Sequence, residues 1–155
     1  MGVINRKEIT SKLNILLEQY LKVFDTRIYW AKEVTFDYST AHKIRVDYMR
    51  FKPINNTISG IEKGDFYCYE VKSCVDDFFS KNGHNFIGDY NYYVMERELY
   101  EQVKSNIPYG IGVLIPNRYH SLESIRKAKR LDRKRPIYEM LLMMFRSANR
   151  DRLGA

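Results

Sequence analysis

Between residues 6 and 24, apolar side chains recur every three or four positions, which is the spacing of one face of an amphipathic helix. Further along, β-branched and aromatic residues form short runs separated by Gly, Pro, Asn and Ser, a pattern typical of strands and turns. The pattern predicts helices over 6–24, from 75, and over 98–105, 122–134 and 137–150, with strands over 27–37, 43–51, 65–73, 90–95 and 109–115.

The order of these elements indicates the fold class. The first three strands follow one another and predict a meander, whereas the later strands alternate with helices. We therefore expect an α/β or α+β fold, with a mixed sheet flanked by helices. The 155 residues suit a single domain, with a core over about 6–116 and C-terminal helices over 121–151.

Two local details refine this picture. The segment 54–64 is polar, contains Gly60 and Gly64, and predicts an irregular connection. Ser73, followed three residues later by Asp76, matches a capping box and predicts the start of the short helix.

Composition narrows the cellular setting. No apolar run approaches the roughly 18–20 residues that span a bilayer, and the first residues lack a signal-peptide apolar segment. We therefore expect a cytoplasmic protein without a membrane partner. Cys68 and Cys74 lack Cys-x-x-Cys spacing, which disfavours structural zinc and favours free thiols in a reducing compartment, although a disulfide between them stays open.

The formal net charge of +7 is concentrated near the C-terminal end. Residues 118–135 contain eight basic side chains and only two acidic ones. On a helix over 122–134, these cations would contact the phosphates of a nucleic acid, although a solvated helix face is the simpler alternative. The candidate phosphate contacts are Arg126, Lys127, Lys129, Arg130, Arg133 and Lys134.

Candidate chemistry lies on the predicted strands. Glu70 and Lys72 are two residues apart, so both side chains should leave one side of their strand. Asp47 is the only acid in the middle of the preceding strand, and Glu33 lies on the strand before that. Such acids suit Mg²⁺ or Mn²⁺, with the Val71 carbonyl as a further ligand and the lysine orienting a water. A surface ion pair between strands is the structural alternative.

The same residues carry a resemblance to a known family. Glu33, the Arg-Val-Asp run 45–47, the run 69–78 and the Asp-Tyr pair 89–90 are similar to those of the MmcB-like DNA-repair-associated proteins, which belong to the PD-(D/E)xK, restriction-endonuclease-like nuclease superfamily. The sequence resembles small phage and prophage proteins of Gram-positive bacteria still more closely. The resemblance covers roughly residues 33–115.

The resemblance implies an αβββαβ core that opens with the helix 6–24. It implies Asp47 and Glu70 as metal ligands and Lys72 as the catalytic lysine. Glu33 matches an acid ahead of the motif, and Glu18 on the first helix is its rival for that role. Val46 departs from the family pattern, which has proline before the acid.

Three further features have both a functional and a structural interpretation. His84 is a candidate phosphate contact or proton carrier, although a hydrogen-bonded loop histidine is more common. Tyr90 is a candidate for stacking on a base, although half-buried strand tyrosines are the usual case. The last helix is either packed in the core or part of a homodimer face, and packing is favoured; its apolar residues are Met140, Leu141, Met143, Met144 and Phe145.

Two functions follow as hypotheses. The first is a metal-dependent nuclease that acts on DNA in phage recombination, repair or processing. The second is an inactive module on the same fold, which binds nucleic acid or inhibits a host defence protein.

Overall fold

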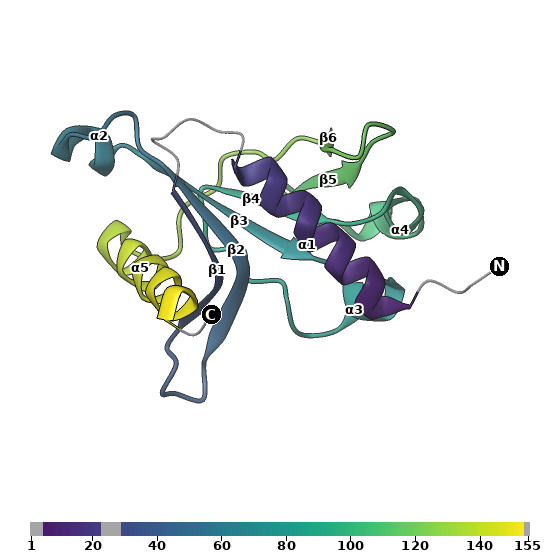
Figure 1. Cartoon of the computed structure of the whole chain (residues 1–155), viewed down its shortest axis with the longest axis horizontal. Helices are drawn as coiled ribbons and strands as arrows, with labels where there is room; N and C mark the ends of the chain where they lie inside the picture. The colour runs from purple at the N-terminus through teal and green to yellow at the C-terminus, as the bar shows by residue number, and fades with distance from the viewer. Residues whose placement is uncertain (1–4, 23–28, 154–155) are drawn as a thin grey trace.

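One mixed sheet of six strands runs through the computed structural model, which describes residues 5–22 and 29–153 (Figure 1). The elements are α1 (Arg6–Lys22), β1 (Tyr29–Phe36), β2 (Ile44–Lys52), α2 (Ile58–Glu62), β3 (Asp65–Val71), α3 (Val75–Phe79), β4 (Tyr90–Val94), α4 (Arg97–Val103), a 3₁₀ turn (Lys104–Asn106), β5 (Gly112–Pro116), β6 (Leu122–Arg126) and α5 (Ile137–Leu153).

The six strands lie side by side in the order in which they occur along the chain. The pairs β1–β2 and β2–β3 are antiparallel, the pairs β3–β4 and β4–β5 are parallel, and β6 is antiparallel to β5. The meander and the mixed sheet with flanking helices are therefore confirmed. Because β3, β4 and β5 are parallel, their carboxyl ends lie at one edge of the sheet, where α/β proteins commonly place functional groups.

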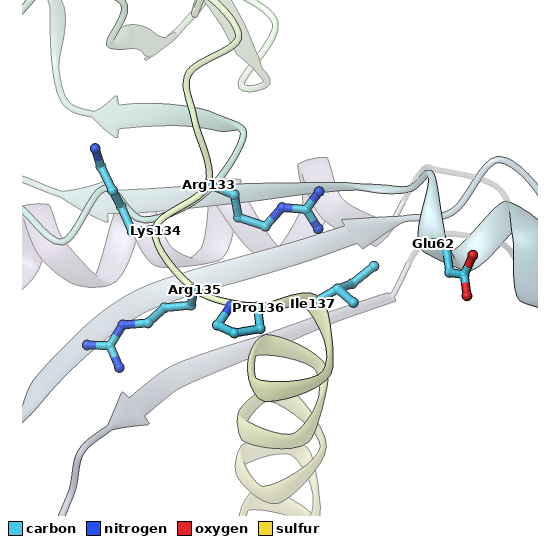
Figure 2. Close-up of a pocket in the computed structure, with 6 residues that line it drawn as sticks. All are labelled: Glu62, Arg133, Lys134, Arg135, Pro136 and Ile137. Carbon is cyan, nitrogen blue, oxygen red and sulfur yellow. The ribbon is translucent and has the colours of Figure 1, made fainter.

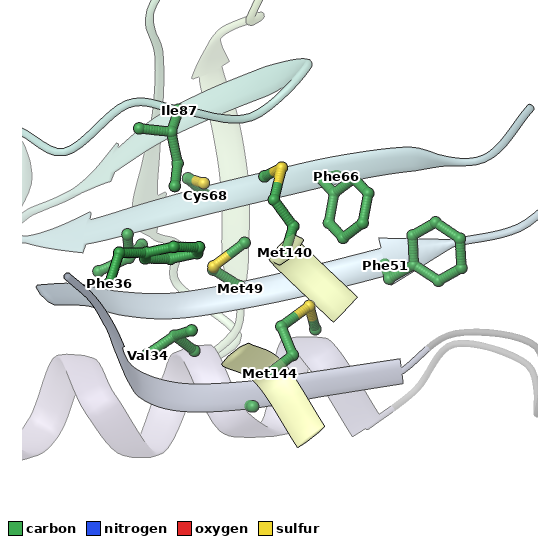
Figure 3. Packing of buried hydrophobic residues seen from close by; sticks show 11 residues of the cluster. Val34, Phe36, Met49, Phe51, Phe66, Cys68, Ile87, Met140 and Met144 are labelled. Carbon is green, nitrogen blue, oxygen red and sulfur yellow. The ribbon is translucent and has the colours of Figure 1, made fainter. Parts of the chain in front are cut away.

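Helices cover both faces of the sheet (Figure 1). Apolar side chains of α1, such as Leu13 and Leu17, pack with Tyr69 on one face. On the other face, Met140 and Met144 of α5 pack with residues of β1, β2 and β3 (Figure 3). A third cluster, beneath α4, contains Tyr93, Met95, Leu99, Val103, Val113 and Ile115. Packing of α5 in the core, which the sequence favours, is thus confirmed for Met140 and Met144, with Leu141 and Met143 partly buried against the same cluster, whereas Phe145 is 70% exposed.

Element boundaries differ from the predictions in several places. The ends predicted at residues 24 and 27 lie outside the described residues. The connection 54–64 contains the short helix α2, with Thr57 as its N-cap. The residue that caps α3 is Cys74 rather than Ser73. Ser73 meets Asp77 instead of Asp76, because Oδ2 of Asp77 accepts hydrogen bonds from the Ser73 amide (2.9 Å) and hydroxyl (3.2 Å).

The basic helix predicted over 122–134 is wrong. Asn117 closes a turn with Ser121, so the chain folds back along β5 and forms β6. Residues 127–135, which we name the basic strap, then run without regular structure across the sheet. Their amides donate to neighbouring loops rather than to the preceding turn of a helix: Lys129 to Gly110, Leu131 to Asp89 and Lys134 to Ile87. Turn chemistry and these tertiary hydrogen bonds outweigh helical propensity here.

The structure also bears on the state of the two cysteines and on the question of a membrane-spanning helix. Both cysteines are free thiols, with Cys68 buried and Cys74 half-buried. Burial raises the pKa of the Cys68 thiol well above its ordinary value, which makes it inert at neutral pH. Within residues 5–22 and 29–153, none of the helices combines the length and the apolar character that a bilayer crossing requires.

Candidate active site

The candidate site lies where β2 and β3 separate. Their pairing ends at Tyr48 opposite Tyr69, and the next residues along are Asp47 and Glu70. Oδ2 of Asp47 accepts a hydrogen bond of 2.9 Å from the Val71 amide. A side-chain carboxylate thus takes the place that a main-chain carbonyl would have in a continued ladder. Burial is the main cause that raises the pKa of Asp47, although the Val71 hydrogen bond opposes it.

Glu70 is fully buried, and neither of its carboxylate oxygens has a hydrogen-bond partner of acceptable geometry within the described chain. Burial raises the pKa of Glu70 well above its usual range and the neighbouring Asp47 adds to that rise, while Lys72 and the nearby Asn85 amide, which does not reach full hydrogen-bond geometry, partly oppose it. A buried carboxylate with two unsatisfied oxygens is costly, and natural proteins rarely keep one without a reason. The electrostatics of this position therefore favour an added cation.

Lys72 lies beside the acids, with only 2% of its surface exposed. Its Nζ donates to the carbonyls of Asn82 (2.9 Å) and Asp77 (3.3 Å). A Cβ atom built at Gly83 would stand 2.5 Å from this nitrogen and 3.5 Å from Oε2 of Glu70. The lysine and the glutamate therefore leave β3 on the same side, as their spacing predicts.

Glu33 does not join the cluster. It lies opposite Asp47 in the register of β1 and β2, but the pairing skips this position and its φ is 52°. Ala31 and Val34 both contact the α5 cluster, so the alternation of β1 changes phase between them. The Glu33 side chain is 54% exposed, with Oε2 3.9 Å from Nη2 of Arg150 on α5. It turns towards α5 because of this irregularity in the strand.

The structure therefore brings two acids and one amine together, rather than the three acids that the sequence suggested. Within residues 5–22 and 29–153, no group of three or more His, Cys, Asp or Glu side chains could hold a metal ion. Val71 is adjacent to Asp47 through its amide, and its carbonyl remains a predicted ligand. Two carboxylates are enough for Mg²⁺, which keeps several waters and takes further oxygens from a phosphate.

The auxiliary residues have structural partners. Glu18 accepts a hydrogen bond of 2.8 Å from the Tyr48 hydroxyl, on the α1 face of the sheet and away from Glu70. The ring nitrogens of His84 lie 2.7 Å from the Tyr93 hydroxyl and 2.8 Å from the Ser80 carbonyl. The structural interpretation of both residues is thus the better supported one.

Tyr90 lies at the end of β4 remote from the acids. It pairs with Tyr67 near the start of β3, whereas Glu70 pairs with Tyr93 near the other end. The Tyr90 ring stacks on Tyr67 with centroids 4.9 Å apart. A role for Tyr90 at the two acids has no geometric support.

The basic strap is partly used inside the molecule. Arg130 pairs with Asp65 and Asp89, and Nε of Arg133 lies 3.5 Å from Oδ1 of Asp89. By contrast, Lys127 forms no ion pair with any described residue, and the same is true of Lys134. Nη2 of Arg126 donates to the Pro108 carbonyl at 3.4 Å, and Nζ of Lys129 lies 4.9 Å from the centroid of the Tyr109 ring.

An open pocket of about 480 Å³ lies where the strap enters α5 (Figure 2). Arg135 lines it but is already paired with Asp37 at 2.9 Å and Glu139 at 3.5 Å. Glu62 of α2 also lines it, which places the pocket near the start of β3 rather than at Glu70. The other lining residues are Arg133, Lys134, Pro136 and Ile137. This pocket is separate from the acids.

Sequence reasoning missed the residues that surround Lys72. Asp77 and Asn82 supply carbonyls to its amine, Gly83 packs against it, and Tyr93 is the β4 neighbour of Glu70. The Asn-Gly pair at 82–83 was a usable signal for a tight turn, but nothing local in the sequence shows that this turn lies over the acids.

A comparison of the chain with protein-family models, curated proteins and solved structures gives no match. The resemblance to the PD-(D/E)xK superfamily therefore stays a prediction from the motif residues.

Proposed function

We propose that the chain is a metal-dependent phosphodiesterase that acts on DNA, of the PD-(D/E)xK type. One observation carries the proposal: Glu70 is buried with two unpartnered oxygens, beside the carboxylate of Asp47 and the ammonium of Lys72. A purely structural ion pair would satisfy those oxygens with donors. An unpartnered Glu70 beside the second acid Asp47, whose Oδ2 is held by the Val71 amide, instead suits a hard divalent cation.

The residues divide the work according to their chemistry. Asp47 and Glu70 would hold Mg²⁺ or Mn²⁺, which when bound polarises a phosphoryl oxygen and makes a water nucleophilic. Lys72 holds a positive charge next to them, where it can bind a phosphodiester oxygen or orient the attacking water. The Val71 amide fixes the Asp47 carboxylate at 2.9 Å, so this acid is in place before any ligand binds.

The biological setting belongs to the same proposal. The motif resemblance supports DNA as the substrate and phage recombination, repair or processing as the context. The cytoplasm as the compartment stays a prediction from the hydropathy of the sequence. Lys127 and Lys134, the two strap lysines without an ion pair among residues 5–22 and 29–153, would contact the phosphates of the substrate. A homodimer stays a prediction.

Titration of Mn²⁺ by calorimetry tests the metal site. The wild-type chain should bind Mn²⁺, and Glu70→Gln and Asp47→Asn should each weaken binding by about 100-fold or more, because each removes one of two anionic ligands. Glu123→Gln is the matched control, since Glu123 is a half-exposed acid on β6, and it should bind as the wild type does. Retained affinity in both site variants would refute the metal site.

Nicking of supercoiled plasmid in Mn²⁺ tests the chemistry. Lys72→Met should lower the rate by about 100-fold or more, because the charge beside the reacting phosphate is lost. Lys52→Met, at the exposed end of β2, is its control. Equal nicking by wild type, Lys72→Met and Glu70→Gln would assign the activity to a contaminant and reject the proposal.

One observation favours the second candidate function, an inactive module on this fold. The Lys72 amine already donates hydrogen bonds to two main-chain carbonyls, and its side chain is almost completely buried. If DNA binds to the chain without Mn²⁺, and if no nicking appears although the metal titration is positive, the chain binds nucleic acid without cutting it.

A further inference from the structure

The loop between α3 and β4 covers Glu70 and Lys72, whereas Asp47 is half-buried beside them. Its residues 80–85 have no regular secondary structure, and Lys81 and Asn82 are exposed on its outer side. Beneath it, the Glu70 side chain is fully buried and Lys72 is 2% exposed. A hydrated cation and a phosphodiester therefore have no path to these atoms while the loop keeps this position.

Gly83 is the point of closest contact between loop and site. Its φ of 76° lies in the region that side chains disfavour, and a Cβ atom there would stand 2.5 Å from Nζ of Lys72. Only glycine can therefore occupy this position without strain and without displacing the amine. The close fit shows that the loop rests on the site rather than merely passing near it.

Few polar contacts hold the loop down. Nζ of Lys72 donates to the Asn82 carbonyl at 2.9 Å, and Nδ2 of Asn85 donates to the Arg45 carbonyl of β2 at 2.8 Å. The His84 ring bonds to the Ser80 carbonyl and to the hydroxyl of Tyr93, the β4 neighbour of Glu70, so it ties the base of the loop to the sheet. Breaking the first two bonds would free the tip while the His84 contacts stay intact.

We propose that residues 80–85 form a lid over Glu70 and Lys72, closed in this structure, which opens to admit the cation and the phosphodiester. The lid rests on the proposed function for its purpose, but its opening does not depend on metal or DNA. When it opens, Lys72 exchanges the Asn82 carbonyl for solvent or for a phosphate oxygen. Opening of this kind is a local transition that leaves the sheet intact.

Acetylation of Lys72 by an amine-reactive ester, followed by peptide mass spectrometry, measures the opening directly. The reaction is run on the full chain without metal or DNA, so it reports nothing about catalysis. In the wild type, Lys72 should react roughly ten- to a thousand-fold more slowly than the exposed Lys81 of the same loop, because only the open minor state reacts.

Gly83→Ala should accelerate Lys72 acetylation about ten-fold, since the closed lid then contains a strained residue in contact with the amine. Gly110→Ala is the matched control: its φ of 83° imposes the same strain, but its neighbour is Leu131 of the basic strap. It should leave the rate at Lys72 unchanged. Asn85→Ala, which removes only the hydrogen bond to Arg45, should accelerate the reaction by a few-fold and decides the matter if Gly83→Ala does not fold.

Three results would overturn the lid. The first is equal labelling of Lys72 and Lys81 in the wild type, the second is no acceleration in Asn85→Ala, and the third is equal acceleration in Gly83→Ala and Gly110→Ala, which indicates global unfolding. Failure of the metal titration together with the expected labelling would instead reject the phosphodiesterase and leave the lid standing.

Discussion

Two buried carboxylates near opposite ends of the β3–β4 pair differ in what surrounds their oxygens. Asp89, 3% exposed and just before β4, accepts from the Phe66 amide at 2.8 Å and lies 3.5 Å from the guanidinium groups of both Arg130 and Arg133. Glu70, near the end of β3, has no donor of full hydrogen-bond geometry among the described residues, and its weaker contact is with the Asn85 amide. The fold itself satisfies the hydrogen-bonding capacity of the first acid, whereas it leaves that of the second largely unsatisfied.

The difference separates an acid with a structural role from the acid on which the proposed function rests. The partners of Asp89 come from the basic strap, and its main-chain carbonyl also accepts from Leu131, so this acid anchors the strap to the sheet. The neighbours of Glu70 are another acid and a lysine whose protons are directed at carbonyls. Burial alone thus does not mark a site; the combination of burial and missing donors does.

Replacing Asp89 should have the largest effect on stability. Asp89→Ala removes the acceptor of the Phe66 amide and of both arginines, so we expect a loss of about 3 kcal/mol of unfolding free energy in urea. Asp132→Ala, an exposed acid of the same strap, should change it by less than about 0.5 kcal/mol. A loss at Asp89 no larger than that of the control would show that the strap is not anchored there.

Replacing Glu70 should have the opposite sign. In the absence of metal, Glu70→Gln should raise the stability at pH 8 by about 1–2 kcal/mol, because the neutral amide can be buried without the proton uptake that burial imposes on the carboxylate. The raised pKa of Glu70 means that the folded chain keeps its proton where the unfolded chain has lost it. Wild-type stability therefore falls as pH rises above the ordinary value of 4.5 through the folded pKa, and the variant lacks this slope.

Urea unfolding at pH 5 and at pH 8 measures that slope. The advantage of Glu70→Gln should be small at pH 5 and grow towards pH 8. A variant that is less stable than the wild type at both values would show that the carboxylate is satisfied in the folded chain, and the contrast with Asp89 would disappear.

The smallest expected effects are those of substitutions in the basic strap on the salt dependence of DNA binding. Arg130→Gln should leave the salt dependence of DNA binding unchanged, because Arg130 is occupied by Asp65 and Asp89, and should cost less than about 1 kcal/mol of stability. Lys127→Gln should leave stability unchanged and lower the salt slope by about one, the value for one phosphate contact. Binding isotherms at several salt concentrations measure both. An equal change of the salt slope in the two variants would contradict the distinction between strap cations that are paired inside the molecule and those that are not.

Some of this arrangement was predictable from the sequence. The strand period of two placed Glu70 and Lys72 on one side of β3, and the acid at the centre of β2 lies opposite them because the two strands form a hairpin-like pair. Both results depend only on local geometry. The same period of two gave a wrong orientation for Glu33, because a residue with positive φ interrupts the alternation of β1. No pattern in the sequence predicts that interruption.

Tertiary contacts determine what the sequence did not show. The strap is irregular rather than helical because its amides donate to carbonyls that lie 19 to 47 residues earlier in the chain, a separation over which local propensity carries no information. The cover over Lys72 likewise depends on carbonyls of Asp77 and Asn82, whose orientation follows from α3 and the turn at Gly83. Residue types alone identify the acids but not their accessibility.

Because the strands lie in chain order, each can pair with the strand synthesised just before it. The exception to this local order is α5, which packs on β1 and whose Ser147 hydroxyl bonds to the Lys32 carbonyl, 115 residues earlier. On the ribosome, the surface around Met49 and Phe66 therefore stays bare until Met140 and Met144 emerge (Figure 3). At that stage of synthesis the sheet is assembled but its apolar face is still exposed to solvent. The polypeptide then has the greatest need of a chaperone.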